Sequence, residues 1–495
     1  MNCIYKSVLA LGILGGSVPV MAQTETDALR FGQTSVTGTA RSLAVGGAMG
    51  AVGGDMSASS INPASLGIYR TSEFIITPTL KFGNNSADYL NTNTSTGFSR
   101  FSINNFGAVF STPARGADYE KKNWKSVAFG ITFNKLQDFN EEGRYKGNNK
   151  ESSITEVFAE DAARYGTSWQ MAPPYGALAW EGFLIDENNH SYVYNDILLN
   201  GGSVNQEKSW RKRGNVQEWG LVFGGNYREK LMIGGSLNIL SYRYNSTVNY
   251  YEEDASTNTG NNFDYLTYNE YLDTRGVGFN AKFGMLYNIN TDVRVGGHIS
   301  TPTWSAMNDE ADYEIRTETE ALSGTRVVRP DKPYYYEYSL RTPWKVGVNA
   351  MTYLGNKGFI SADYEYIAYN TMSYSFPGFQ SGADNVNRQI QNTFTGGHVI
   401  RVGAEGRFDN LFVRAGVAHH TSPFKESKTF GGARTDFSVG GGVNLQGFSI
   451  NLAYVYALRS YSEYGYPIVY SGIPVGLGKI NNNNNFIALS LGFKL

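Results

Sequence analysis

The side chains that could ligate a metal or a haem are few and lie far apart in the sequence. Haem ligation is one chemistry open to an imidazole, but no haem-attachment motif accompanies any of the histidines. His419 and His420 are neighbours, so in a strand their rings would point to opposite faces. We therefore expect no metal site and no cofactor. The five histidines are His190, His298, His398, His419 and His420.

Catalytic patterns are also missing from the sequence. The only cysteine, Cys3, lies in a leader that we expect to be removed, which excludes thiol catalysis and disulfides in the rest of the chain. Residues 276–281 read Gly-Val-Gly-Phe-Asn-Ala and superficially match a dinucleotide fingerprint, but they lie inside an expected strand and open no helix. No nucleophile elbow and no acid–base pair of carboxylates is identifiable. We predict no catalytic residues and no enzyme activity.

One long connection between expected strands contains an unusual concentration of apolar side chains. Residues 139–214 are expected to form a long loop, in which Ser153–Glu156 fits a capping box and predicts a helix. A second apolar stretch covers residues 175–184. An exposed apolar patch would indicate a function, whereas a buried one would only pack the loop onto its neighbours. Both interpretations stay open, and the predicted hydrophobic capture site consists of Phe158, Trp169, Leu178, Trp180, Phe183 and Leu184.

The composition favours a sheet. The 495 residues include 34 Tyr, 28 Phe and 57 Gly, and only 17% are charged, where a soluble protein averages about 25%. Aromatic residues and glycine at low charge suit strands joined by tight turns. A net charge of -2 gives no indication of nucleic-acid binding.

The first 22 residues are typical of a secretory signal peptide. Lys6 is the only charge before an apolar stretch at residues 8–20, and Val20-Met21-Ala22 offers small residues for cleavage before Gln23. A membrane anchor is the alternative, but this stretch is shorter than the ~20 residues of a spanning helix. We therefore expect an exported protein.

Alternation with a period of two recurs along the remaining chain. Trp219, Leu221 and Phe223 share one face of a segment, for example, and one apolar face at period two predicts a strand. Strands are expected at 73–82, 98–111, 124–138, 215–226, 231–248, 268–288, 292–305, 334–353, 358–370, 398–408, 411–420, 435–445, 448–460 and 485–495.

The connections between these strands alternate in length. Outer-membrane barrels have short periplasmic turns and long external loops, whereas a soluble sandwich has no reason to separate them. The sequence therefore predicts an all-β fold: a transmembrane antiparallel β-barrel of about 14 strands in the outer membrane of a Gram-negative bacterium. Short connections lie at 226–230, 288–291, 354–358, 408–410 and 445–447, and long ones at 139–214, 249–267, 306–333, 371–397 and 461–484.

The segment before the first strand differs from the rest. Residues 46–55 are mostly glycine and other small residues, and 61–67 read Ile-Asn-Pro-Ala-Ser-Leu-Gly. This is too apolar for a free linker and too glycine-rich for a stable helix, so we expect a plug folded into the barrel lumen. The expected division is a signal peptide at 1–22, a hatch at 23–72 and a barrel at 73–495.

Several stretches resemble the FadL family of outer-membrane transporters for hydrophobic compounds. Residues 44–72, with Asn62, Pro63 and Ala64 at their centre, are similar to the family's N-terminal hatch. Residues 342–348, 361–366 and 398–424 resemble its later strands in order. The chain looks most similar to Bacteroidetes members, some of which are labelled haemin receptors.

This resemblance implies a monomeric channel in outer-membrane lipid. A hydrophobic small molecule, long-chain fatty acid-like or aromatic, would be captured outside, pass a moving hatch and leave sideways into the membrane. Loop 139–214 departs from the family pattern, so no ligand contact is carried over to it. Two alternatives remain: a barrel that docks surface or secretion partners, and a haemin receptor.

Overall fold

The protein was analysed as a computed structural model. It describes residues 23–116, 118–170, 173–188, 191–194, 198, 202–257, 260–319, 324–466 and 475–495. The expected signal peptide, residues 1–22, and His190 lie outside the described residues. Within the described ranges, no helix has both the length and the apolar character to cross a membrane.

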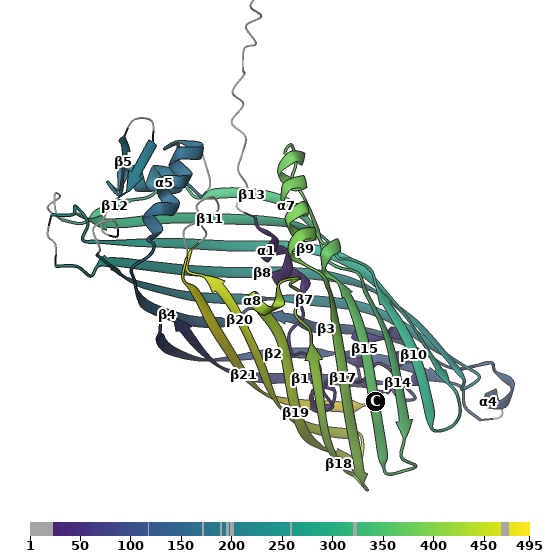
Figure 1. Ribbon diagram of the computed structural model, residues 1–495. Coiled ribbons are helices and arrows are strands. Elements are labelled where there is room, and N and C mark those ends of the chain that lie inside the picture. The colour runs from purple at the N-terminus through teal and green to yellow at the C-terminus, as the bar shows by residue number, and fades with distance from the viewer. Residues whose placement is uncertain are drawn as a thin grey trace, which may run out of the picture.

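The described strands form a closed antiparallel barrel of 14 wall strands (Figure 1). Four wall strands are interrupted and appear as the pairs β3/β4, β10/β11, β13/β14 and β15/β16, and β12 is a short addition to β11. The strands are β1 (Glu73–Tyr89), β2 (Thr92–Pro113), β3 (Trp124–Asp138), β4 (Glu141–Asn149), β7 (Val204–Tyr227), β8 (Leu231–Asp254), β9 (Tyr265–Asn288), β10 (Val293–Ser300), β11 (Trp304–Glu318), β12 (Arg326–Val328), β13 (Tyr334–Arg341), β14 (Lys345–Tyr353), β15 (Gly358–Ala368), β16 (Ser373–Ser375), β17 (Gly396–Phe408), β18 (Leu411–His420), β19 (Gly431–Leu445), β20 (Phe448–Tyr464) and β21 (Leu477–Lys494).

The last strand closes the barrel against the first. β21 pairs antiparallel with β1 from Glu73 opposite Lys494 to Asp88 opposite Lys479. This pairing leaves no open sheet edge between the chain's first and last wall strands, which a bilayer requires because lipid cannot satisfy free backbone groups. The predicted antiparallel β-barrel of about 14 strands is confirmed.

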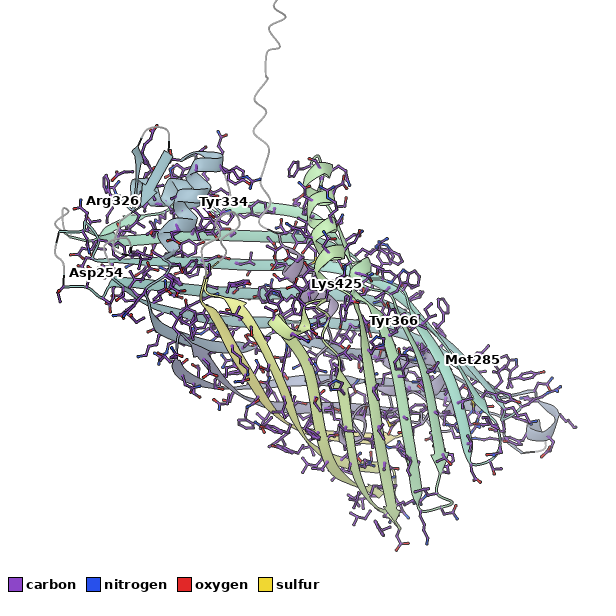
Figure 2. The ribbon with its side chains drawn as sticks, viewed as in Figure 1. Asp254, Met285, Arg326, Tyr334, Tyr366 and Lys425 are labelled. Atoms are coloured by element: carbon purple, nitrogen blue, oxygen red, sulfur yellow. The ribbon has the colours of Figure 1, made fainter. Side chains whose placement is uncertain are left out.

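Apolar side chains point outward and polar ones inward along the wall. On β8 and β9, Leu237, Val277 and Phe279 are 64%, 60% and 61% exposed, whereas the inward Asn238 and Asn280 are buried and hydrogen-bonded to each other at 2.8 Å. Figure 2 shows the side chains that cover the outside of the wall. An apolar exterior around a polar interior is the arrangement of a barrel that spans lipid.

The helices lie inside the barrel or at its ends. Four short helices precede β1, and Figure 1 shows α1 within the barrel outline. A long insertion between β4 and β7 carries two helices and a small hairpin of β5 (Ile185–Asn188) and β6 (Ser191–Tyr194). The helices are α1 (Glu25–Gly32), α2 (Ala40–Ala44), α3 (Ala58–Ile61), η1 (Pro63–Ile68), α4 (Asp118–Lys121), α5 (Ile154–Tyr165), α6 (Tyr175–Glu181), η2 (Tyr369–Thr371), α7 (Gln380–Thr393) and α8 (Ser427–Phe430).

Several strands extend further toward the long-loop end than the sequence predicts. The expected loop 139–214 contains β4 and the first half of β7, so its non-strand part begins at residue 150. The outer parts of β4 and β7 carry polar side chains on the outward face and only scattered apolar ones, such as Tyr145 and Trp210, on the inward face, so their alternation is weak. The single strand expected at 334–353 is interrupted at Thr342–Trp344, where Pro343 has no backbone N–H for the ladder.

Candidate functional site

A row of glycines on the inner wall receives the chain segment at residues 23–70, which we call the N-terminal segment. Gly224, Gly234 and Gly284 lie opposite one another on β7, β8 and β9. A Cβ on Gly234 would lie 2.5 Å from the Pro63 carbonyl carbon, and one on Gly284 would lie 1.9 Å from Asn62 Oδ1. The missing side chains therefore let the turn at 62–67 approach the wall backbone closely.

Asn62 fastens this turn to the wall. Its side chain is fully buried, and its Oδ1 accepts a hydrogen bond from the Ala64 N–H at 3.1 Å, which caps η1. Its Nδ2 donates to the carbonyls of Met285 and Gly297 and to Asn349 Oδ1, at 3.4, 3.3 and 3.3 Å. The predicted residues Asn62, Pro63 and Ala64 thus lie together against the wall, and their role as a moving hatch stays a prediction.

A second group of glycines holds the N-terminal segment from β17–β19. A Cβ on Gly403 or Gly416 would lie 2.2 Å from the backbone of Val45. Beside it, Arg41 Nε lies 3.1 Å and Arg414 Nε 2.6 Å from the same Glu405 carboxylate. The segment is therefore seated on two separate parts of the wall.

A cavity of about 180 Å³ lies between the N-terminal segment and the wall. Its charged lining residues are mostly paired: Lys282 with Glu218 at 2.7 Å, Arg434 with Asp436 at 3.1 Å, and Arg401 with Glu365 at 3.5 Å. Apolar side chains form another part of the lining, together with uncharged polar residues and glycines. The apolar residues are Phe31, Val36, Leu43, Ile61, Leu136, Val216, Leu240 and Val455.

The wall loses its backbone pairing beside this cavity. β2 pairs with β3 only up to Asn105 opposite Asn134, and within the described ranges no backbone pair joins the outer part of β2 to β4. β4 instead pairs with β7. Its contact with β2 includes a side-chain hydrogen bond, which Thr94 Oγ1 on β2 donates to the Arg144 carbonyl on β4. We call this unpaired edge, β2 residues 92–104 beside residues 135–149, the seam. Asn134 and Leu136 at its start also line the cavity.

Buried charges connect the two sides of the seam near the point where the pairing of β2 with β3 stops. Asp138 Oδ1 lies 3.1 Å from Lys81 Nζ on β1, and its Oδ2 lies 2.7 Å from Lys135 Nζ. Lys135 also donates to Ser102 Oγ on β2 at 2.7 Å. The N-terminal segment joins the same place, since Ser35 N–H donates to the Leu136 carbonyl at 2.9 Å. A movement of that segment would therefore act directly on the seam.

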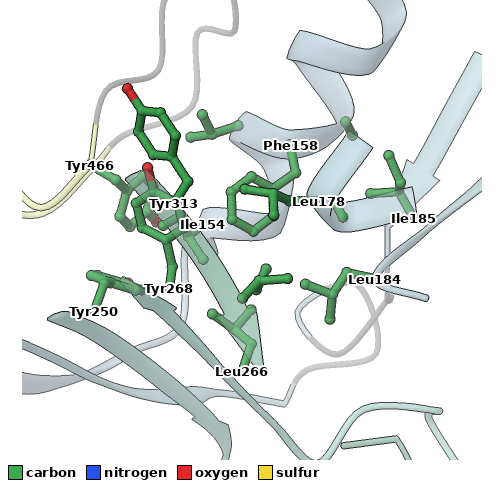
Figure 3. Packing of buried hydrophobic residues seen from close by; sticks show 14 of the residues in the cluster. Ile154, Phe158, Leu178, Leu184, Ile185, Tyr250, Leu266, Tyr268, Tyr313 and Tyr466 are labelled. Atoms are coloured by element: carbon green, nitrogen blue, oxygen red, sulfur yellow. The ribbon is translucent and has the colours of Figure 1, made fainter. Parts of the chain in front are cut away.

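The insertion between β4 and β7 packs its apolar residues onto the strand ends (Figure 3). Phe158 and Leu178 are fully buried and Leu184 is 1% exposed, in a cluster that includes Tyr268 and Tyr313 from the wall. Helix α5 begins at Ile154, behind its Ser153 cap, which confirms the helix predicted from the capping box. These three members of the predicted capture site contribute to the interior of the loop.

The other predicted capture residues lie nearer the surface. Trp180 and Phe183 are 40% and 49% exposed. Trp169 is partly buried and donates its indole N–H to Glu181 at 2.7 Å. Ligand capture by this surface stays a prediction. Nearby, burial raises the pKa of Asp161 to about 6, although its carboxylate accepts the Gly176 N–H at 2.9 Å.

The described histidines have separate polar partners. His298 contacts Asn349 at 3.1 Å, His398 contacts the Tyr364 hydroxyl at 2.8 Å, and His420 contacts Arg434 at 2.8 Å. In the part of the chain that the structure describes, no group of three His, Cys, Asp or Glu residues could hold a metal ion.

Sequence reasoning did not identify the glycine row, the seam or the charges beside it. The glycines had a detectable signal, because glycine inside a strand often marks the close approach of another backbone. The interrupted pairing of β2 had none, since Tyr145 is the only large apolar side chain of β4 and makes no alternating pattern by itself.

Comparison with solved structures shows a shared barrel fold. A Pseudomonas aeruginosa FadL homologue has 12% sequence identity and a TM-score of 0.52, over 93% of this chain and 99% of that chain. The Ralstonia pickettii toluene transporter TbuX has 16% identity and a TM-score of 0.50, over 93% and 99%. The P. putida toluene transporter TodX has 12% identity and a TM-score of 0.52, with the same coverage. No protein-family model and no curated protein matches the sequence.

Proposed function

We propose that this protein is a monomeric outer-membrane channel for the uptake of hydrophobic small molecules, either long-chain fatty acid-like or aromatic. The apolar exterior of the closed barrel supports a place in a bilayer. The fold shared with a FadL homologue and two toluene transporters supports the class of cargo. The proposal includes export through a cleaved signal peptide at residues 1–22.

The observation that carries the proposal is the seam beside the cavity. The N-terminal segment is seated against the wall beside the cavity, and the cavity reaches Asn134 and Leu136, where the pairing of β2 with β3 ends. Outside this edge, Phe101 and Ile103 are 67% and 40% exposed toward the expected lipid. A solute leaving here would enter the bilayer without crossing the rest of the lumen.

Physical chemistry favours such a lateral exit for an apolar solute. Release into water would cost about 25 cal/mol for each Å² of apolar surface, whereas entry into lipid costs nothing comparable. In the proposed route, the outer loop with Trp180 and Phe183 captures the molecule and the N-terminal segment acts as a hatch. Movement of Ser35 away from Leu136 then loosens the seam.

A hatch held to the wall tests this route. Ser60 Oγ lies 2.7 Å from Asn134 Nδ2, so the double variant Ser60→Cys/Asn134→Cys can be joined by a short bifunctional thiol reagent. The chain's own Cys3 lies in the expected leader, so the mature protein would carry no competing thiol. Joining the two cysteines is expected to stop uptake of a fluorescent long-chain fatty acid into cells or proteoliposomes.

Two controls make the result specific. Ser60→Cys treated with the same reagent should retain uptake, as should the double variant without reagent. Undiminished uptake by the joined double variant would exclude hatch movement. If the unmodified protein takes up neither the fatty acid nor toluene, the proposed function itself is wrong.

A further inference from the structure

A row of arginines lies on the outer surface of the wall, just beyond its apolar band. On β9 the exposed Val277 is followed at the next outward position by Arg275, whose side chain is 68% exposed. On β8 the exposed Ile239 is followed by Ser241 and then by the exposed Arg243. Each outward step is about 7 Å along a strand, so these guanidiniums stand at the depth where lipid headgroups begin.

Two of these arginines face each other directly. Arg243 on β8 pairs with Arg275 on β9 in the strand register, and such partners have Cα atoms about 5 Å apart. Like charges directly opposite are destabilising in a sheet. Asp273 lies 2.9 Å from Arg275 and offsets its charge, whereas the Arg243 side chain has no hydrogen bond or ion pair among the described residues. An anion between the two guanidiniums would remove this repulsion.

Two more outward arginines, Arg211 and Arg213 on β7, extend the row toward β4. They lie 3.5 and 3.9 Å from Glu142, which Arg100 also contacts at 2.7 Å from the opposite, inner face of β2. Glu310 on β11, which pairs opposite Asp273, is a further acid beside the row. Four outward guanidiniums, those of Arg211, Arg213, Arg243 and Arg275, therefore lie beside three carboxylates, those of Glu142, Asp273 and Glu310.

We propose that this arginine row binds a phosphorylated lipid headgroup of the outer leaflet. The guanidinium fork matches phosphate oxygens in a bidentate way, and the row lies on the long-loop side of the apolar band, which is the outer side in the membrane. The inference uses the membrane placement of the proposed function and is independent of transport.

Titration of the detergent-purified protein with lipid A bisphosphate, followed by native mass spectrometry, tests the proposal. Arg243→Gln/Arg275→Gln should weaken binding by at least tenfold, because two charge-assisted contacts to phosphate are lost. Raising the salt concentration should weaken the wild type in the same direction. The matched control is Arg316→Gln, an exposed β11 arginine that is 53% exposed and paired with Glu314 at 2.7 Å, and it should bind like the wild type.

Three further measurements complete the test. Fully dephosphorylated lipid A should bind at least tenfold more weakly, and inorganic phosphate or a long-chain fatty acid at the same concentration should not displace the lipid. Heat-modifiable migration on gels verifies that each variant is a folded barrel. Equal binding by wild type and Arg243→Gln/Arg275→Gln, or by the dephosphorylated lipid, would overturn the proposal. If the wild-type protein binds lipid A bisphosphate but takes up no fatty acid, the transport route is wrong and the lipid site still stands.

Discussion

Adding one methyl group to the glycine row should unseat the turn at residues 62–67. In Gly234→Ala the new Cβ would lie 2.5 Å from both the Pro63 carbonyl carbon and its oxygen, and 2.6 Å from the Ala64 nitrogen. These are backbone atoms, so no side-chain rotation can relieve the clash and the turn itself must move. Gly235→Ala is the matched control, because its Cβ would meet nothing closer than 3.5 Å.

The expected cost is about 1–3 kcal/mol, the usual penalty of overpacking a well-packed contact. This corresponds to a roughly 5- to 150-fold larger population of the unseated segment. Hydrogen–deuterium exchange of the amides at 58–68, measured by mass spectrometry, should accelerate by that factor in Gly234→Ala and stay unchanged in Gly235→Ala. Equal exchange in Gly234→Ala and the wild type would refute the seating argument, provided that both variants migrate as folded barrels.

Perturbations at four other residues have defined outcomes. Asp138→Asn leaves Lys81 and Lys135 buried without a counter-charge, so the barrel should lose about 3–5 kcal/mol and its heat-modification midpoint should fall; an unchanged midpoint would contradict this. Burial raises the pKa of Asp161 to about 6, so the folded loop binds this proton more tightly than the unfolded loop does. The resulting stabilisation of the loop is complete below about pH 4, the ordinary pKa of the group, and it disappears as the pH rises through 6. Proteolysis of the loop should therefore be faster at pH 7.5 than at pH 4.5 in protease-matched assays, and Asp161→Asn should flatten that difference. Phe158→Ala removes a fully buried ring and should cost about 3–5 kcal/mol of loop stability. Trp180→Ala removes a ring that is 40% exposed, so it should cost less stability than Phe158→Ala and should reduce uptake; full uptake by Trp180→Ala would remove it from the capture site.

Much of the barrel could be read from side-chain alternation. Segments such as 277–287 and 487–495 place apolar residues at every second position, and lipid on one side of the wall enforces this pattern. The same pattern, with tight turns such as 226–230, predicted about 14 strands. The strands and their turns depend on local sequence, so they were predictable.

The features that shape the candidate site depend on contacts between distant residues. The seam arises because β4 pairs with β7 and does not pair with β2. Contacts between distant residues determine this pairing, for example the contact between Lys81 and Asp138, which are 57 positions apart. Asn62 acquires its role from the carbonyl of Met285, 223 positions away. The sequence shows Pro343 inside an expected strand, but it does not show that the strand is interrupted there and appears as β13 and β14. No local pattern records such pairings, so the sequence could not predict them.

The central claim is that a hydrophobic molecule leaves through the seam between β2 and β4. Photolabelling with a diazirine-bearing long-chain fatty acid during uptake, followed by peptide mass spectrometry, tests this claim most directly. Exit through the seam should concentrate the adducts at residues 98–104 and 134–138. Adducts confined to the tight turns at 289–292 and 354–357, with none at the seam, would show exit through the far end of the lumen and contradict it.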